Sequence, residues 1–91
     1  MTISDIRIRL IHRIESKLRA VASFTIDNCF AVHDIRIYER EDGFYIMMPN
    51  RKTAEGGYKD IAHPLNTETR NMLQKSILDE FFRTQTAEPQ A

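Results

Sequence analysis

The sequence predicts an α+β domain: an antiparallel β-sheet of about five strands with hairpin connections, packed by one C-terminal amphipathic helix. Apolar and polar residues alternate in several short segments of the first half of the chain, which is typical of half-buried strands. Pairs of turn-forming residues separate these segments. One longer segment, 67–83, instead repeats its apolar residues at helical spacing.

The first three strands are predicted from alternation. In the segment 2–11, Ile6, Ile8 and Leu10 alternate with arginines, and β-branched residues favour a strand. Segments 18–26 and 30–38 alternate in the same way and are separated by Asp27 and Asn28, whose side chains can hydrogen-bond to the local backbone. We therefore expect a tight hairpin over residues 18–38.

The later strands are shorter. An Asp-Gly turn leads into the apolar run 44–48, which predicts a strand covered on both faces, although a buried interface would give the same pattern. Pro49 ends this run, because proline cannot donate to a β-ladder. Residues 50–57 predict a polar loop, and residues 58–62 predict a short strand.

The helix is the clearest element. Either Asn66 or Thr67 can cap its first turn by accepting a backbone N–H. Leu73, Ile77 and Phe81 are four residues apart and define the stripe that faces the sheet. Over residues 67–83 the helix would be roughly 25 Å long, enough to cross a small sheet.

Length indicates one domain. We assign residues 1–83 to it and predict that the polar segment 84–91 is a disordered C-terminal tail. A chain of 91 residues buries only about two-thirds of its unfolded surface, so its core is modest and a homo-oligomer would add buried area.

The net charge and the lack of apolar runs exclude several classes of protein. The 13 basic and 13 acidic residues cancel, so any site for a polyanion must be a local patch. The sequence has no apolar run typical of a signal peptide or a membrane span, and its single cysteine cannot form an internal disulfide. We expect a cytoplasmic protein that does not bind membranes.

The sequence contains no convincing catalytic or metal site. Its three histidines are far apart and none has a partner at metal-ligand spacing. Cys29, His33 and Asp34 are the residue types of a nucleophile, base and orienting group, but adjacent strand residues point to opposite faces. We interpret Cys29 as a buried or half-buried structural thiol. The expectation is a protein that is not an enzyme and takes no cofactor, metal or small-molecule substrate.

A basic cluster is the strongest candidate site. Arg51 and Lys52 are adjacent in the polar loop, Lys59 follows the glycine pair, and Arg70 lies near the start of the helix. Folding of the loop towards the helix would bring these cations together, where they and the helix N–H groups could contact phosphates. An ordinary solvated loop is the simpler alternative. Arginines of the first three strands could form a second basic stripe, or could pair with Asp5, Asp34 and Glu39.

Ordered segments of the chain resemble the SpoVG family of bacterial septation regulators. They span residues 3–9, 20–27, 32–36, 48–53, 60–64 and 66–70. In the family, the loop after Met-Pro commonly reads Ser-Lys-Arg-Thr-Pro-Asp-Gly, whereas this chain has 50–56 as Asn-Arg-Lys-Thr-Ala-Glu-Gly. The basic pair is retained, and the proline that stiffens the loop is absent.

The resemblance implies a dimeric cytoplasmic regulator that binds DNA or RNA, or both, and is linked to septation and sporulation. Phosphate contacts would come from the four cations, and base contacts from neighbouring polar residues. The resemblance places Arg51, Lys52, Thr69 and Arg70 at positions of the family's motif. With the neighbouring residues of the basic cluster, the predicted nucleic-acid contacts are Asn50, Arg51, Lys52, Thr53, Lys59, Asn66, Thr69 and Arg70. The expected dimer interface is the run of Phe44, Tyr45, Ile46, Met47 and Met48. The alternative is a protein-interaction module that acts on division or regulatory proteins through a strand edge, without binding nucleic acid.

Overall fold

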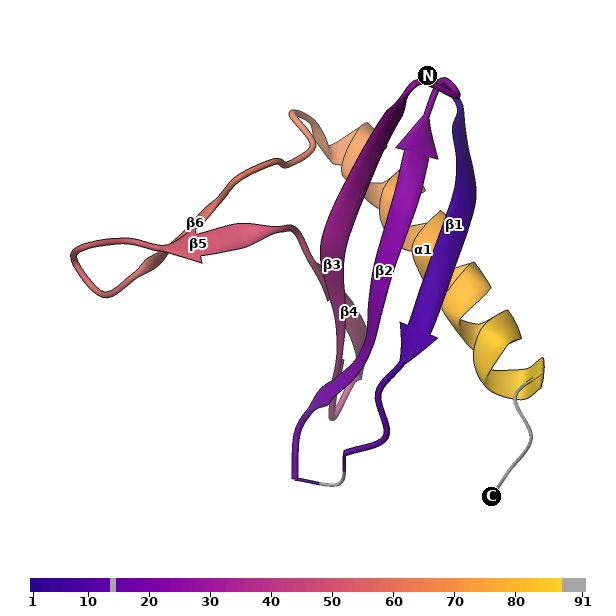
Figure 1. The fold of residues 1–91 in the computed structure, drawn as a ribbon. Coiled ribbons are helices and arrows are strands. Elements are labelled where there is room, and N and C mark those ends of the chain that lie inside the picture. Colours follow the sequence, from indigo (N-terminus) through magenta and orange to yellow (C-terminus); the bar gives the residue numbers. More distant parts are fainter. Residues whose placement is uncertain (14, 88–91) are drawn as a thin grey trace.

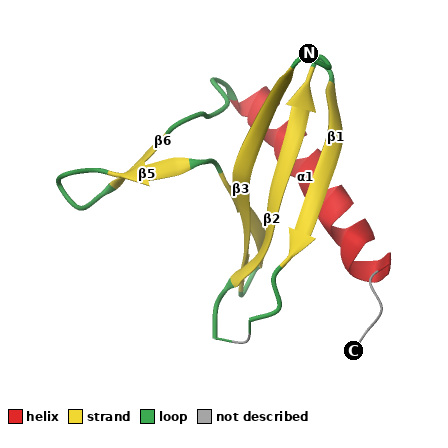
Figure 2. Cartoon of the chain, viewed as in Figure 1, coloured by secondary structure: helices red, strands yellow, loops and turns green. Residues whose placement is uncertain are grey.

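The fold is an antiparallel sheet with one helix across one face, and a separate ribbon that projects from the sheet (Figures 1 and 2). The computed structural model describes residues 1–13 and 15–87. Four strands, β1 (Ile3–Leu10), β2 (Leu18–Ile26), β3 (Phe30–Arg40) and β4 (Gly43–Met47), pair in chain order. The ribbon consists of β5 (Asn50–Lys52) and β6 (Tyr58–Asp60), and α1 (Thr67–Ala87) follows. The predicted α+β class with hairpin connections and one helix is confirmed.

The core lies between the sheet and α1. Leu73, Ile77 and Phe81, which the sequence placed on one helical stripe, are the buried residues of α1. They pack with the inward residues of the central strands, and Ile35, Ile37, Ile77 and Phe81 are fully buried. The other buried members of this core are Ala20, Ala22, Phe24, Ile46 and Met48. Among the described residues, no helix lies over the opposite face of the sheet (Figure 1).

The helix begins where the sequence predicted and ends later. The Asn66 side-chain oxygen accepts the Thr69 backbone N–H at 2.8 Å, so Asn66 is the N-cap. At the other end α1 continues to Ala87, so residues 84–87 of the predicted tail are helical, and residues 88–91 lie outside the described residues. Residues 84–87 contain neither glycine nor proline, and Pro89 is the first residue that opposes helix formation.

Two β-bulges interrupt the regular alternation of β1 and β3. Asp5 and Asp34 have positive φ values of 50° and 64°, and the pairing register shifts beside each of them. Simple alternation would put Val32 and Ile35 on opposite faces, but Ile35 is in the core and Val32 packs against it. The extra residue of each bulge therefore resets the alternation, so that Ile3 and Ile6 both pack against the core, as Val32 does beside buried Ile35.

The predicted polar loop 50–57 is partly wrong, because residues 50–52 form β5 and pair with β6. The sequence of β5 carries no apolar residue, so no hydrophobic pattern identified it as a strand. Among the described residues, no helix is both long and apolar enough to cross a membrane.

Candidate nucleic-acid interface

The β5–β6 ribbon carries three of the four predicted cations away from the body of the protein (Figure 1). In its register, Arg51 is directly opposite Lys59, and Lys52 is opposite Tyr58. Opposite residues of an antiparallel pair share a face, so Arg51 and Lys59 point to one face, and Lys52 and Tyr58 to the other. All four are exposed, which gives the ribbon a cation on each of its faces.

These ribbon cations are not neutralised within the chain. Among residues 1–13 and 15–87, ion pairs occupy Arg7, Arg19, Lys75 and Arg83, and none involves a cation of the ribbon. Two like charges directly opposite each other destabilise a strand pair. The pairing of Arg51 with Lys59 therefore costs the isolated chain stability that an anion bound to both would restore.

The turn of the ribbon is held by Thr53 and Gly57. The Thr53 backbone N–H donates to the Gly57 carbonyl at 2.8 Å, and the Thr53 hydroxyl accepts the Gly57 N–H at 3.2 Å. Gly56 has a φ of 90°, a conformation that side chains disfavour. Thr53 was predicted as a base contact, but its hydroxyl instead closes the turn between β5 and β6, the two strands that carry the cations.

Asn50 is at the base of the ribbon. Its side-chain amide donates to the Met48 carbonyl at 3.0 Å, and Asn50 is half-buried and opposite Asp60. A backbone bond from the Ile61 N–H to the Pro49 carbonyl, at 2.7 Å, closes the same end. Asn50 thus fixes how the ribbon leaves the sheet, whereas Arg51 and Lys52 are its accessible neighbours.

The predicted residues at the start of α1 separate into two roles. Asn66 is occupied as the helix cap, and Thr69 is half-buried beside the apolar side chains of Phe24, Met48 and Leu73. Arg70 is exposed. Of these three, only Arg70 has its functional group available to a ligand at the surface.

The predicted gathering of Arg70 with Arg51 and Lys52 is not seen in the hollow lined by Arg70 among the described residues. Arg70 lines this hollow beside β4 together with Asp60, Met47 and Met48, and the lining of the hollow includes neither Arg51 nor Lys52. The physical reason is that β5 is a strand: it carries Arg51 and Lys52 outward along the ribbon instead of letting the segment fold back over the helix. The chain thus presents a basic ribbon and a separate arginine near its base.

The residues of the predicted dimer segment, 44–48, alternate between the core and the opposite face of the sheet. Ile46 and Met48 belong to the monomer core, and Phe44 packs with its ring 5.2 Å from that of Phe81 and 5.3 Å from that of Phe82. Tyr45 and Met47 point to the opposite face. Three of the five predicted interface residues therefore pack into the apolar interior of the monomer, which a short apolar run could not reveal.

Tyr58 is a candidate contact that the sequence interpretation missed. Its side chain is 72% exposed and shares a ribbon face with Lys52. An exposed aromatic ring beside a cation is the combination that stacks on a base while a phosphate is neutralised. The sequence carries one signal of this contact, which is a tyrosine between Gly57 and Lys59 in an otherwise polar segment.

The segment Cys29–Asp34 also differs from expectation. Cys29 is exposed, not buried as predicted, because it lies in the β2–β3 turn. His33 and Asp34 both line one shallow hollow, together with Arg7 and Arg9, and Asp34 has the positive φ of the β3 bulge.

Comparison with known proteins accounts for nearly the whole chain. The sequence model of the SpoVG family matches residues 1–83. A Caldicellulosiruptor bescii protein named "Putative septation protein SpoVG" is 52% identical over 81 residues, covering 89% of this chain and 91% of its own. Proteins of the same name from Clostridium perfringens (strain 13 / Type A) and Clostridium novyi are 50% identical over 90 residues and 56% over 81. They cover 99% and 89% of this chain, and 99% and 80% of their own lengths. The chain therefore belongs to the SpoVG family.

Proposed function

We propose that the protein is a non-enzymatic regulator that binds DNA or RNA through the β5–β6 ribbon, with Arg70 as an additional phosphate contact. One observation carries the proposal: Arg51 and Lys59 are exposed, directly opposite each other and without an ion pair among the described residues. Such a like-charge pair destabilises the ribbon in the free protein, and it contributes binding free energy when both charges contact a polyanion.

The shape of the ribbon supports the same proposal. A two-stranded β-ribbon is one of the two elements that the major groove of B-DNA admits. On this ribbon, cations on both faces would contact the backbones that flank the groove, and Tyr58 would contact a base or a sugar. Asn50, Thr53 and Asn66 position these groups, as their hydrogen bonds within the chain indicate.

The named septation proteins among its relatives support a role in septum formation and sporulation control, exerted in the cytoplasm. We propose that the regulator acts as a homodimer joined at the edge of β4, the last strand of the sheet, which pairs only with β3 among the described strands. Tyr45 and Met47 flank this edge on the open face. Two ribbons held in one dimer would increase affinity by effective concentration.

The test compares two variants that each lose two positive charges. Arg51→Ala with Lys52→Ala removes ribbon cations, and Lys75→Ala with Arg83→Ala removes cations from the helix surface. Both are titrated against labelled duplex DNA and against RNA over a range of salt concentrations. The ribbon variant should bind more weakly, and its slope of log affinity on log salt should be shallower by about 0.9 for each lost duplex contact. Equal behaviour of the two variants would reject the ribbon as the contact.

The β4 edge also favours a second candidate, a module that recruits a division or regulatory protein by strand addition. An unpaired edge offers backbone N–H and carbonyl groups to an extended partner segment. Replacing Met47 by proline should abolish partner binding, whereas the ribbon variant should retain it. Light scattering on the wild type and on both variants shows whether the same edge joins two copies of the chain. A specific dimer forms at tens of micromolar, so a wild type that is monomeric at that concentration would reject the homodimer.

A further inference from the structure

The face of the four-stranded sheet opposite α1 carries a row of side chains in register across all four strands. Arg9 of β1 pairs with Val21 of β2, Val21 with Arg36 of β3, and Arg36 with Met47 of β4. The neighbours of these residues along each strand are inward-facing, since Ala20, Ala22, Ile35, Ile37 and Ile46 are buried in the core. The row therefore lies on the open face.

The two arginines of this row are available for a ligand. Both are exposed, and neither has an ion-pair partner among residues 1–13 and 15–87. Carboxylates do occur near the row: Asp5 is paired with Arg7 at 3.1 Å, and Asp34 lies at the β3 bulge. Asp42 accepts the Tyr45 hydroxyl at the rim of the face, and Glu39 and Glu41 line the same end of it. None of these carboxylates forms an ion pair with Arg9 or Arg36, so the charges of these two arginines are not neutralised among the described residues.

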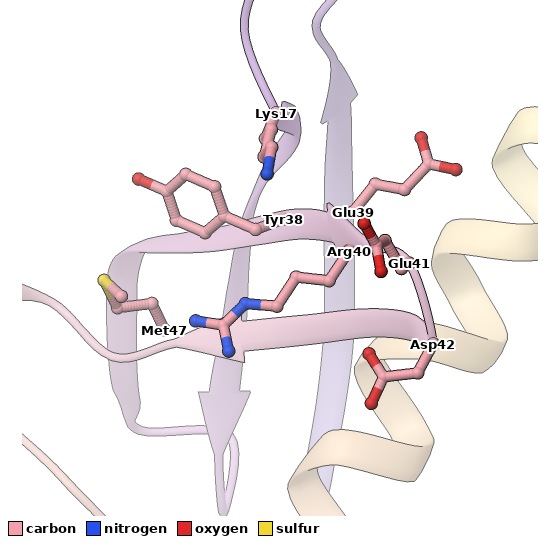
Figure 3. A pocket seen from close by; sticks show the side chains of 7 residues that line it. All are labelled: Lys17, Tyr38, Glu39, Arg40, Glu41, Asp42 and Met47. Carbon is pink, nitrogen blue, oxygen red and sulfur yellow. The ribbon is translucent and has the colours of Figure 1, made fainter.

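Aromatic side chains lie beside the row. Tyr38 is two residues along β3 from Arg36 and is directly opposite Tyr45 of β4. The Arg40 guanidinium is 4.6 Å from the centre of the Tyr45 ring, so Tyr45 already has a cation against its ring. In Figure 3 the Arg40 side chain extends back along the hairpin towards Met47 and Tyr38, whereas Glu41 and Asp42 lie at the turn.

We propose that this open face binds single-stranded nucleic acid, with Arg9 and Arg36 on phosphates and the half-buried ring of Tyr38 stacked on a base. Arg9 and Arg36 are two strands apart, so their backbones are about 10 Å apart, and Tyr38 is about 7 Å further along β3. This footprint fits two or three nucleotides. A four-stranded antiparallel sheet with aromatic residues on its uncovered face is an architecture that binds single strands elsewhere, here as an analogy.

Charge favours nucleic acid over a second copy of the chain on this face. A two-fold contact would place the same surface on both partners, so the unpaired Arg9 and Arg36 of one copy would face a surface that carries the same two unpaired arginines. A polyanion instead neutralises both arginines of the row. The proposed dimer contact at the β4 edge extends the sheet sideways and leaves its open face free.

This site extends the proposed function and is physically separate from the ribbon, so the two are tested apart. The probes are a labelled dodecamer of deoxythymidine, the same length of uridine, and a labelled duplex. The variants are Arg9→Gln with Arg36→Gln, Tyr38→Leu, the ribbon pair Arg51→Gln with Lys52→Gln, and the helix pair Lys75→Gln with Arg83→Gln as the charge-matched control. Thermal unfolding confirms that each variant is folded.

The row variant should bind the single strands at least about tenfold more weakly than the helix control, with a salt slope shallower by about 1.4, and should bind the duplex as the helix control does. Tyr38→Leu should weaken single-strand binding about fivefold or more, through the loss of one stacked base. The arginine changes affect exposed side chains, so the row variant remains informative if Tyr38→Leu does not fold.

Three results would overturn the assignment. They are absence of single-strand binding by the wild type, row and helix variants of equal single-strand affinity, or a row variant whose oligomeric state changes in light scattering, which would make the face a protein interface. A ribbon variant that loses duplex binding alongside any of these leaves the proposed function standing. If the ribbon variant still binds the duplex, the ribbon is rejected as the duplex contact. If the row variant binds single strands weakly in the same experiment, the open face of the sheet is supported as the single-strand site.

Discussion

Arg51 and Lys59 are directly opposite each other in the β5–β6 ribbon, where they place two positive charges on one face of an element only three residue pairs long. Such a short ribbon is marginally stable by itself. Two opposing effects therefore meet at this pair: repulsion weakens the ribbon in the free protein, and the same charges supply its attraction for a polyanion.

Lys59→Glu should separate these effects. An opposite-charge pair in place of a like-charge pair should stabilise the ribbon by about 0.5 kcal/mol, seen as slower hydrogen exchange of the Thr53 amide that donates to Gly57. Affinity for duplex nucleic acid should fall at the same time. Lys75→Glu makes the same charge change on the helix and should leave Thr53 exchange unchanged. Weaker binding together with faster exchange would mean that the substitution only unfolds the ribbon.

The cap of α1 gives a stability prediction. Asn66→Ala removes the oxygen that accepts the Thr69 N–H and should lower the free energy of unfolding by about 1 kcal/mol in urea titrations. Asn71→Ala, an exposed change inside the same helix, should be neutral or slightly stabilising, because alanine is the better helix former. Equal losses for the two variants would contradict the assignment of Asn66 as the cap.

The bulge in β3 gives a second prediction. Asp34 has a φ of 64°, which glycine adopts readily and β-branched residues resist. Asp34→Gly should be neutral or stabilise the protein by up to about 1 kcal/mol, and Asp34→Val should destabilise it by about 1–3 kcal/mol. His33→Val is the control, since His33 is exposed in β3 without a positive φ. If valine were tolerated equally at 33 and 34, the bulge would carry no backbone strain.

The aromatic cluster under the sheet predicts unequal costs for neighbouring residues. Phe81 is fully buried and Phe82 is 43% exposed, although both rings contact Phe44. Phe81→Ala should lower the unfolding free energy by about 3–5 kcal/mol, because it leaves a cavity in the core. Phe82→Ala should cost clearly less. Urea unfolding of both variants measures the difference, and a larger loss for Phe82 would contradict this packing.

The fold was predictable because its main elements have regular patterns. Ile77 and Phe81 repeat at helical spacing, Ile35 and Ile37 alternate in a strand, and Asp27 with Asn28 forms a turn, with φ values of 49° and 57°. Bulges break that logic, since one extra residue changes the face of everything beyond it. The aspartate at position 34 does not identify the bulge, because aspartate is also common in ordinary turns.

The candidate site was less predictable than the fold. Adjacency of Arg51 and Lys52 identified the basic segment, but the position of Lys59 opposite Arg51 depends on a pairing register that polar strands do not encode. The row of Arg9 and Arg36 is likewise a product of strand order, which brings together residues 27 positions apart. The local sequence identifies candidate cations, but the pairing of the strands determines which of these cations lie on the same face of a sheet or ribbon.

The hydrogen bond between Tyr45 and Asp42 predicts a pH dependence with a defined sign. The Tyr45 hydroxyl donates to the Asp42 carboxylate at 2.7 Å; this bond lowers the pKa of Asp42 and raises the pKa of Tyr45. A lowered carboxyl pKa contributes stability above the ordinary aspartate range, and the contribution is lost as pH falls through the folded-state pKa. A raised tyrosine pKa contributes stability below the ordinary tyrosine range, and that contribution is lost as pH rises through the folded-state value.

Tyr45→Phe removes this bond and should therefore destabilise the protein most at neutral pH. The difference in unfolding free energy between wild type and Tyr45→Phe, measured by urea titration across the pH range, should shrink towards both the acidic and the alkaline ends. Tyr58→Phe is the control, because Tyr58 is exposed on the ribbon and has no side-chain hydrogen bond among the described residues. Its difference from wild type should not vary in the acidic range. A Tyr45→Phe difference that stays constant from acid to alkali would show that the hydroxyl–carboxylate bond does not form in solution.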